Sequence, residues 1–207
     1  AVIDPAGTLS ALPIPSTGGI TVKPVTANDN TNGLPIILDG TTPNASMTVG
    51  AFTGPTIGSI TLSTTNGLIT VATGTTPGTY TVPYTICTVP ATLPLPGTCS
   101  TTTATVVVVP TIEAQDDTPP AIPATGGVTP SVVANDTTNG GVPVVITGAT
   151  PNALLTPGTA PTPAAGSITM NAATGVITVA SGTTPGTYSY PYTICTIPAT
   201  LPLPGTC

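Results

Sequence analysis

The sequence predicts an all-β protein built from two similar domains, and three observations lead to this prediction. Valine, isoleucine, leucine and threonine recur in short alternating runs, which is the pattern of half-buried β-strands. Prolines (27) and glycines (23) separate these runs, as in tight turns. The third observation is an internal repeat, because residues 74–80 recur as residues 182–188, a shift of 108 positions. A chain of 207 residues has room for two domains of about 100 residues each.

The repeat covers most of the chain. Pro83–Cys87 recurs as Pro191–Cys195, and Pro90–Cys99 recurs letter for letter as Pro198–Cys207. Self-similarity at a fixed period is the signature of tandem units. We therefore divide the chain into an N-terminal extension (1–16), a first domain (17–110) and a second domain (111–207).

Each domain is expected to form a series of short strands. In the first domain, alternation and turn residues place seven strands, at Gly19–Thr26, Leu34–Asp39, Ala45–Val49, Ile57–Ser63, Leu68–Ala72, Gly78–Thr88 and Thr101–Val109. Asn66 and Gly67 separate two of these runs and predict a type I′ hairpin turn, in which both residues take a positive φ. Thr174 and Gly175 hold the same place in the second domain. Seven strands in about 100 residues predict two tandem Ig-like Greek-key β-sandwich domains.

Tyrosines mark the start of one strand in each domain. Tyr80 and Tyr188 each follow Pro-Gly-Thr, which predicts a corner tyrosine whose hydroxyl bonds to nearby backbone. An alternative is that an exposed member of the group Tyr188, Tyr190 and Tyr192 stacks against a ligand.

Several motifs resemble those of a known class of repeat. Residues 78–87, then Cys99 and residues 103–109, look like the C-terminal half of bacterial extracellular Ig-like or cadherin-like tandem repeats. The Ala-Asn-Asp segments that end at Asp29 and Asp136 are similar to a segment common in the same repeats. The resemblance implies an extracellular, cell-surface protein of the kind that builds adhesin stalks or filaments, and it says nothing about an adhesion target.

The second domain lacks its last predicted strand within this chain. Its final residue, Cys207, is the counterpart of Cys99, which is followed in the first domain by the strand Thr101–Val109. A sheet without its terminal strand exposes an apolar groove and unpaired backbone groups. We expect that the N-terminal segment of another copy supplies the strand, through the apolar residues Val2, Ile3, Leu9, Leu12 and Ile14.

Donor-strand complementation of this kind is head-to-tail and produces a homopolymer, that is, a pilus-like extracellular filament. The alternative is that the gene continues past Cys207 and that the chain is part of the spacer repeats of a longer cell-surface adhesin. A second alternative is a carbohydrate- or ice-binding module that uses flat, threonine-rich strands.

Four cysteines form two pairs with identical spacing, Cys87 with Cys99 and Cys195 with Cys207. The spacing is not the C-x2-C of zinc sites, and the sequence has no histidine. We expect one structural disulfide within each domain, and hence an oxidising, extracytoplasmic compartment.

The charge composition excludes several functions. Lys23 is the one cationic side chain, seven residues are acidic, and the formal net charge is −6. Neutralisation of phosphates needs Lys and Arg, so nucleic acid is not an expected partner. Insertion into a membrane is not expected either, because no apolar run approaches about 18 residues. Without histidine or arginine, an enzyme is not expected.

The carboxylates offer one candidate metal site. Asp29, Asp116 and Asp117 are candidate Ca²⁺ ligands, because Ca²⁺ takes oxygen ligands and two of these residues lie in the linker between the domains. The alternative is that they are solubilising or turn-forming residues, and that Asp29 and Asp136 bond to local backbone N–H groups in Asx turns. No other cofactor is expected. The abundant threonine and serine hydroxyls are candidate sites for O-linked glycans.

Overall fold

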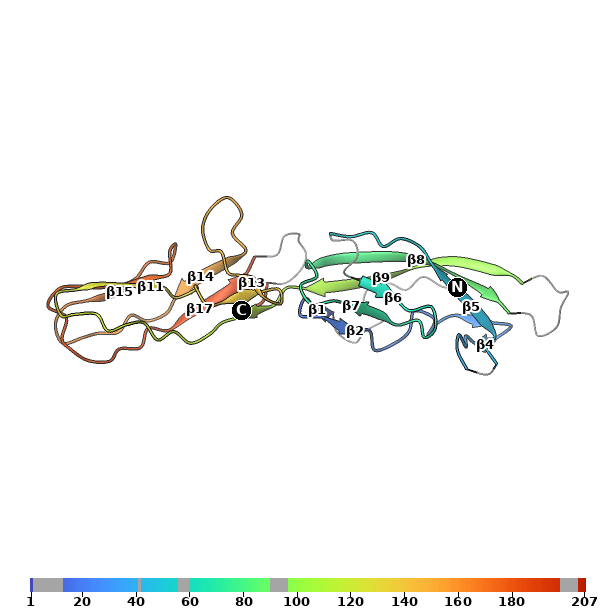
Figure 1. Ribbon diagram of the computed structural model, residues 1–207, viewed down its shortest axis with the longest axis horizontal. Helices are drawn as coiled ribbons and strands as arrows, with labels where there is room; N and C mark the ends of the chain where they lie inside the picture. Colours follow the sequence, from blue (N-terminus) through green and yellow to red (C-terminus); the bar gives the residue numbers. More distant parts are fainter. Residues whose placement is uncertain (2–12, 41, 56–59, 90–96, 198–204) are drawn as a thin grey trace. The chain divides into compact units, whose positions relative to one another are not determined.

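The computed structural model contains strands, turns and loops (Figure 1). It describes residues 1, 13–40, 42–55, 60–89, 97–197 and 205–207, and these residues form no helix. The same residues therefore include no helix that is long and apolar enough to cross a membrane. The prediction of an all-β protein is confirmed. The chain divides into two compact units, Ala1–Val109 (unit 1) and Pro110–Cys207 (unit 2).

In its described residues, unit 1 has nine strands in three sheets. They are β1 (Ile14–Pro15), β2 (Gly19–Ile20), β3 (Asn30–Thr31), β4 (Leu34–Pro35), β5 (Ala45–Val49), β6 (Ile60–Leu62), β7 (Ile69–Val71), β8 (Gly78–Thr88) and β9 (Cys99–Val109). The largest sheet has the order β1-β9-β8-β5, the second has the order β2-β7-β6, and β3 pairs with β4.

The long hairpin β8–β9 is the centre of unit 1. Its antiparallel register runs from Gly78 opposite Val108 to Cys87 opposite Cys99. Successive residues of a strand point to opposite faces, so every second side chain of β8 is buried. The buried apolar core of the unit consists of Ile14, Val25, Ala45, Met47, Ile60, Leu62, Ile69, Val71, Tyr80, Val82, Tyr84, Ile86, Ala104, Val106 and Val108.

The described end of the N-terminal extension belongs to unit 1. Ile14 in β1 pairs in parallel with Val108, and its side chain is only 4% exposed. The Ser16 N–H donates a hydrogen bond of 2.9 Å to the carbonyl of Val109. Ile14 therefore contributes to the core of its own unit. The other four candidate donor residues, Val2, Ile3, Leu9 and Leu12, lie outside the described residues.

The described part of unit 2 has eight strands and a smaller buried core. They are β10 (Ile112–Glu113), β11 (Gly127–Ser131), β12 (Thr137–Thr138), β13 (Val142–Pro143), β14 (Ala153–Pro157), β15 (Ile168–Met170), β16 (Val176–Val179) and β17 (Tyr192–Thr196). The sheets have the orders β10-β12-β13, β11-β16-β15 and β14-β17. The buried core cluster consists of Val132, Val133, Val144, Ala153, Leu155 and Ile194.

The predicted hairpin at Asn66–Gly67 is present, but the predicted turn type is wrong. β6 and β7 pair in antiparallel register on either side of this turn. Gly67 has a φ of +69°, whereas Asn66 is not among the residues with positive φ. The Gly67 N–H donates to the Ser63 carbonyl, and the Asn66 carboxamide oxygen accepts from the Leu68 N–H. The loop is thus longer than the two residues of a type I′ turn. It needs a left-handed backbone only at Gly67, and Asn66 keeps a negative φ.

Candidate functional site

The last strand of unit 2 is shorter than its counterpart in unit 1. The repeat equates β8, which runs from Gly78 to Thr88, with residues 186–196. In unit 2 only the second half of this segment, β17, is a strand, and it pairs with β14. In unit 1 the first half of β8 is held by pairing with the end of β9. Among the described residues of unit 2, no strand pairs with residues 186–191. One backbone hydrogen bond reaches the end of this segment, from the Gly158 N–H to the Pro191 carbonyl at 2.8 Å, and the rest forms an unpaired edge.

Burial of the side chains differs in the same place. Tyr80 and Val82 of β8 are 1% and 0% exposed, whereas their counterparts Tyr188 and Tyr190 are half-buried. In unit 1 the inward side chains Ala104, Val106 and Val108 of β9 cover this face. A β9-like strand would therefore both pair with the edge at 186–191 and cover apolar surface.

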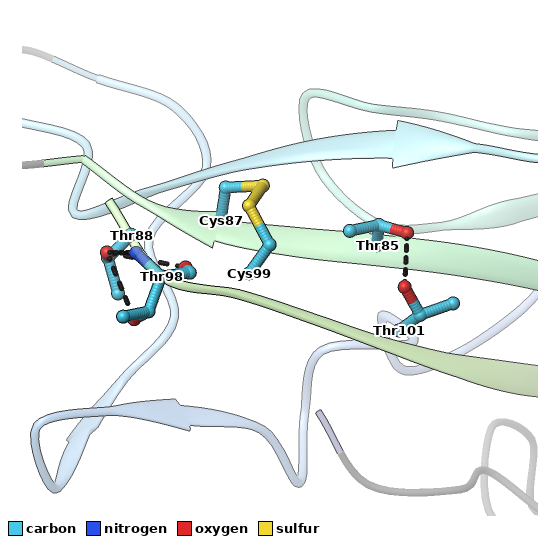
Figure 2. Close-up of a disulfide and its surroundings, with 6 residues drawn as sticks. All are labelled: Thr85, Cys87, Thr88, Thr98, Cys99 and Thr101. Atoms are coloured by element: carbon cyan, nitrogen blue, oxygen red, sulfur yellow. Dashed lines mark hydrogen bonds between the residues drawn. A yellow bond between two sulfur atoms is a disulfide. The ribbon is translucent and has the colours of Figure 1, made fainter. Parts of the chain in front are cut away.

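The predicted disulfides are present, one in each unit. Cys87 bonds to Cys99 (Figure 2). Cys195 bonds to Cys207, and the sequence separation is 12 in both cases. Cys87 and Cys99 are directly opposite in the β8–β9 register, so the disulfide closes the base of the loop that joins the two strands. In unit 2 the disulfide fixes Thr206 beside β17, where the Thr196 N–H donates to the Thr206 carbonyl at 2.8 Å. Two disulfides indicate an oxidising compartment.

A row of threonines crosses the outer face of the β5-β8-β9 sheet. Thr48 is opposite Thr85, and Thr85 is opposite Thr101, so the three side chains lie on one face. The hydroxyls of Thr85 and Thr101 hydrogen-bond to each other at 2.8 Å (Figure 2). The alternative of a carbohydrate- or ice-binding module would use a threonine face of this kind. The mutual hydrogen bond leaves fewer hydroxyl groups for a ligand.

The corner tyrosines are present in both units. The Tyr80 hydroxyl donates to the Thr76 carbonyl at 2.6 Å, and the Tyr188 hydroxyl donates to the Thr184 carbonyl at 2.8 Å. Each bond spans four residues and holds the turn before the strand. Tyr188 thus has a local structural role, and Tyr192 lies in the polar cluster described below.

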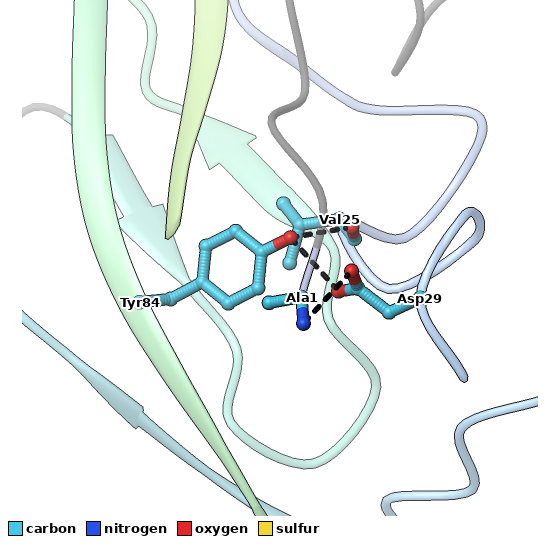
Figure 3. A network of polar contacts seen from close by, with 4 residues as sticks. All are labelled: Ala1, Val25, Asp29 and Tyr84. Atoms are coloured by element: carbon cyan, nitrogen blue, oxygen red, sulfur yellow. Dashed lines mark hydrogen bonds and ion pairs between the residues drawn. The ribbon is translucent and has the colours of Figure 1, made fainter. Parts of the chain in front are cut away.

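Asp29 and Tyr84 form a buried polar cluster in unit 1. The Tyr84 hydroxyl lies 2.9 Å from Asp29 Oδ2 and 3.0 Å from the Val25 carbonyl oxygen, both of which accept hydrogen bonds (Figure 3). The Ala1 ammonium lies 3.9 Å from Asp29 Oδ1. Asp29 is 4% exposed, so the cluster compensates the cost of burying its carboxylate.

The corresponding cluster in unit 2 binds residues of the linker, Gln115 and Asp117. The Gln115 N–H donates to Asp136 Oδ1 at 2.7 Å, and the Tyr192 hydroxyl donates to Asp117 Oδ2 at 2.7 Å. Asp136 is 1% exposed, and its Oδ2 has no hydrogen-bond partner. The expectation of a local Asx turn is therefore wrong for the Asp136 side chain, whose partner is 21 residues away. A contact across the fold is invisible to local sequence reasoning.

Burial and the neighbouring carboxylates raise the pKa of two groups in this cluster. Burial raises the pKa of Asp136, the Gln115 hydrogen bond opposes this rise, and the charge of Asp117 adds to it. The pKa of Tyr192 is also raised, by burial first and then by its hydrogen bond to Asp117 and the nearby carboxylates.

The three candidate Ca²⁺ ligands belong to different units. Asp29 lies in unit 1, whereas Asp116 and Asp117 lie in unit 2. Over the described part of the chain, no group of three or more His, Cys, Asp or Glu side chains is placed to hold a metal ion. Asp117 instead accepts the Tyr192 hydroxyl, and the Asp116 carbonyl accepts the Asn135 side-chain N–H at 3.3 Å. The sequence analysis named Asp136 and Tyr192 but did not predict that they bind the linker.

Comparisons with known proteins supply no relative from which a function can be transferred. A scan against protein-family models finds no match for this sequence, and searches of curated proteins and of solved structures find no significant match either.

Proposed function

We propose that this chain is a structural subunit of an extracellular fibre, in which unit 2 is completed by a β-strand added from outside the unit. The unpaired edge at residues 186–191 carries the proposal, because the backbone groups of such an edge pair with an added strand. The two disulfides support a location outside the cytoplasm. The proposal extends this location to the cell surface and assigns the chain no catalytic role.

The proposed fold of each unit is an Ig-like Greek-key sandwich, as in the bacterial extracellular repeats that the sequence resembles. The β-sheets within unit 1 share one apolar core, which supports this arrangement. Unit 2 is then the same sandwich without the counterpart of β9. Glycans on exposed threonines remain compatible with such a surface.

The proposed donor is the N-terminal segment of another copy. Each copy then offers one donor and one acceptor, so addition continues head to tail and does not close on itself. Ile14 pairs with β9 of its own unit, and this pairing restricts the donated strand to earlier residues. The apolar residues before Ile14 in the sequence are Val2, Ile3, Leu9 and Leu12.

A second candidate function is a spacer of a longer surface protein. The joint between the two units favours it, because β9 completes unit 1 and the same chain then continues into β10 of unit 2. In such a spacer, chain continuity supplies each last strand, and no second copy is needed.

Light scattering and electron microscopy of the purified chain test the fibre. We expect concentration-dependent association into filaments, because the edge at 186–191 pairs with another copy. A variant with residues Ser100–Val109 appended after Cys207 is expected to remain monomeric, because its own tail fills the edge. A chain that is monomeric without the appended strand would overturn the fibre proposal.

Two matched variants identify the donor. One extra serine between Cys207 and the appended strand moves its apolar side chains to the opposite face, so this variant is expected to associate like the original chain. Deletion of residues 2–12 is expected to abolish association. Undiminished filaments after this deletion would show that the N-terminal segment is not the donor.

A further inference from the structure

Unit 2 binds the residues that follow β9 through a specific set of hydrogen bonds. The Asn139 N–H donates to the Thr111 carbonyl at 3.0 Å, and the Thr111 N–H donates to Asn139 Oδ1 at 3.2 Å. The Thr138 hydroxyl also donates to the Thr111 carbonyl, at 2.8 Å. The Thr206 hydroxyl donates to the Pro110 carbonyl, at 2.8 Å. Unit 2 thus recognises the backbone of an extended Pro-Thr pair.

The next residue, Ile112, enters the apolar interior of unit 2. Ile112 lies opposite Thr138 in the β10–β12 pair, and its side chain packs against the core cluster that contains Val144 and Ile194. β10 also contacts β17. The segment Pro110–Ile112 therefore lies between β12 and β17, with polar contacts to its backbone and an apolar contact to its isoleucine.

A pocket in unit 1 is lined by the counterparts of these residues. The repeat equates Thr31, Asn32 and Thr98 with Thr138, Asn139 and Thr206. All three line one pocket, together with Ile86, the counterpart of Ile194, and Ile36, the counterpart of Val144. The pocket combines hydroxyl and carboxamide groups with an apolar wall, as the Pro110–Ile112 site of unit 2 does.

The backbone of the pocket already has the conformation that binds the segment in unit 2. Asn32 and Asn139 both have a φ of +52°, in the left-handed region that few residues other than glycine adopt. This conformation directs the N–H and side chain of Asn139 toward Thr111. Unit 1 holds Asn32 in the same conformation, although no described residue of unit 1 occupies the place of Thr111. A preformed site reduces the ordering cost of binding.

One end of the pocket in unit 1 corresponds to the place in unit 2 where the linker continues beyond Ile112. In unit 2 the chain passes from Glu113 to Gln115, whose N–H donates to the buried Asp136. In unit 1 Ala1 lines the pocket, and its ammonium faces Asp29, the counterpart of Asp136.

We propose that this pocket of unit 1 binds an extended Pro-Thr-Ile segment that follows the last strand of another unit of this repeat. The contacts are those that unit 2 makes to Pro110–Ile112. One continuous segment with the pattern of Ser100–Glu113 then completes unit 2 with its first part and fills the pocket of a following unit 1 with its last part. The inference rests on the second candidate function, the spacer, in which chain continuity supplies the strand that completes unit 2.

A tandem chain tests the pocket directly. Residues Ser100–Glu113 are inserted between Cys207 of one full copy and Ala1 of a second, so that Glu113 precedes alanine as it does in the natural joint. Amide hydrogen exchange is measured by NMR at Asn32 of the second copy and at residues 186–191 of the first. We expect exchange at this Asn32 to slow by about tenfold or more relative to the single chain, toward the rate of Asn139.

Matched variants separate binding from a general gain in stability. Replacing the inserted Thr-Ile pair with Gly-Gly is expected to return Asn32 to its rate in the single chain. N32G keeps the backbone conformation accessible but removes the side-chain acceptor, and it is expected to weaken the protection of the inserted segment. N139G in the single chain provides the benchmark, with the same loss of protection at Thr111.

The two sites report separately. An unprotected Asn32 in a tandem chain whose edge at 186–191 is protected would overturn the pocket inference and leave the added strand intact. A protected Asn32 with an unprotected edge would support the pocket and count against strand completion. Protection at both sites supports the continuous segment.

Discussion

At the scale of single residues, the two corner tyrosines form a natural matched pair. Both hydroxyls donate to the carbonyl four residues earlier, but Tyr80 is buried and Tyr188 is half-buried. We expect Y80F to lower the free energy of unfolding of unit 1 by about 1 kcal/mol, because it removes a hydrogen bond made by a buried side chain. Y188F should cost less in unit 2, where water can replace the hydroxyl. Denaturant unfolding with hydrogen exchange resolves the units, and equal losses would contradict this expectation.

Asp136 should make the stability of unit 2 depend on pH. Burial raises the pKa of Asp136 above the ordinary value of an aspartate, so the folded unit binds the proton more tightly than the unfolded chain. The stability from this group is fully present below the unfolded pKa and is lost as the pH rises through the folded pKa. D136N keeps an acceptor for the Gln115 N–H and cannot ionise, so we expect it to remove this decline.

Hydrogen exchange of unit 2 over a series of pH values above the unfolded pKa measures the effect. D116N is the control, because Asp116 is an exposed carboxylate of the same linker. The decline should persist in D116N. An identical pH profile for D136N and the original chain would show that Asp136 does not cause it.

At the scale of elements, alternation located the well-paired strands correctly. The expected bounds of β5 and β8 agree with the structure, because both strands alternate between a buried and an exposed face. The segments expected at Gly19–Thr26 and Leu34–Asp39 form strands of only two residues each. Near the second of these, Asn44 accepts from the Ile37 N–H and donates to the Pro35 carbonyl, so a side chain replaces a partner strand. The alternation of apolar and polar residues does not reveal where a single side chain takes the place of a partner strand.

The candidate site was predictable where it depends on spacing and not where it depends on distant contacts. Equal cysteine spacing in a repeat predicts both disulfides. The anchoring of the linker could not be predicted without the folded structure. Asp136 binds Gln115, and Tyr192 binds Asp117, from distant parts of the chain. The left-handed conformation of Asn32 has a sequence signature, because Asn32 and Gly33 join β3 to β4 and both have a positive φ, as in a type I′ turn. The pocket beside β3 still needed a comparison of the two folded units.

Loss of the disulfide should have different structural consequences in the two units. We expect C87S/C99S to lower the stability of unit 1 by about 3 kcal/mol, by the chain-entropy estimate for a loop of this size. The register of β8 and β9 should persist, because their pairing extends over the whole hairpin. C195S/C207S should also release Thr206, and hydrogen exchange at Thr111 should then accelerate. Unchanged exchange at Thr111 in C195S/C207S would show that the disulfide does not help to hold the linker.

At the scale of the whole molecule, the two units share one plan and differ in completeness. Unit 1 receives β1 and β9 on the same sheet, and both contribute buried side chains to its core. Unit 2 receives β10 from the linker, and no strand in its described part pairs with the edge at 186–191. Each unit therefore displays the contact that the other lacks: unit 1 shows how the last strand is bound, and unit 2 shows how the incoming linker is bound.

The charge of the chain predicts how salt affects association. The formal net charge is −6 with a single cationic side chain, so copies repel one another at long range and have few groups for ion pairs between chains. Pairing of an added strand relies on backbone hydrogen bonds and apolar burial, which salt does not screen. We expect higher sodium chloride to strengthen association in light scattering, by reducing repulsion. Association that weakens with salt would show that ion pairs hold the copies together, and it would contradict strand addition as the main contact.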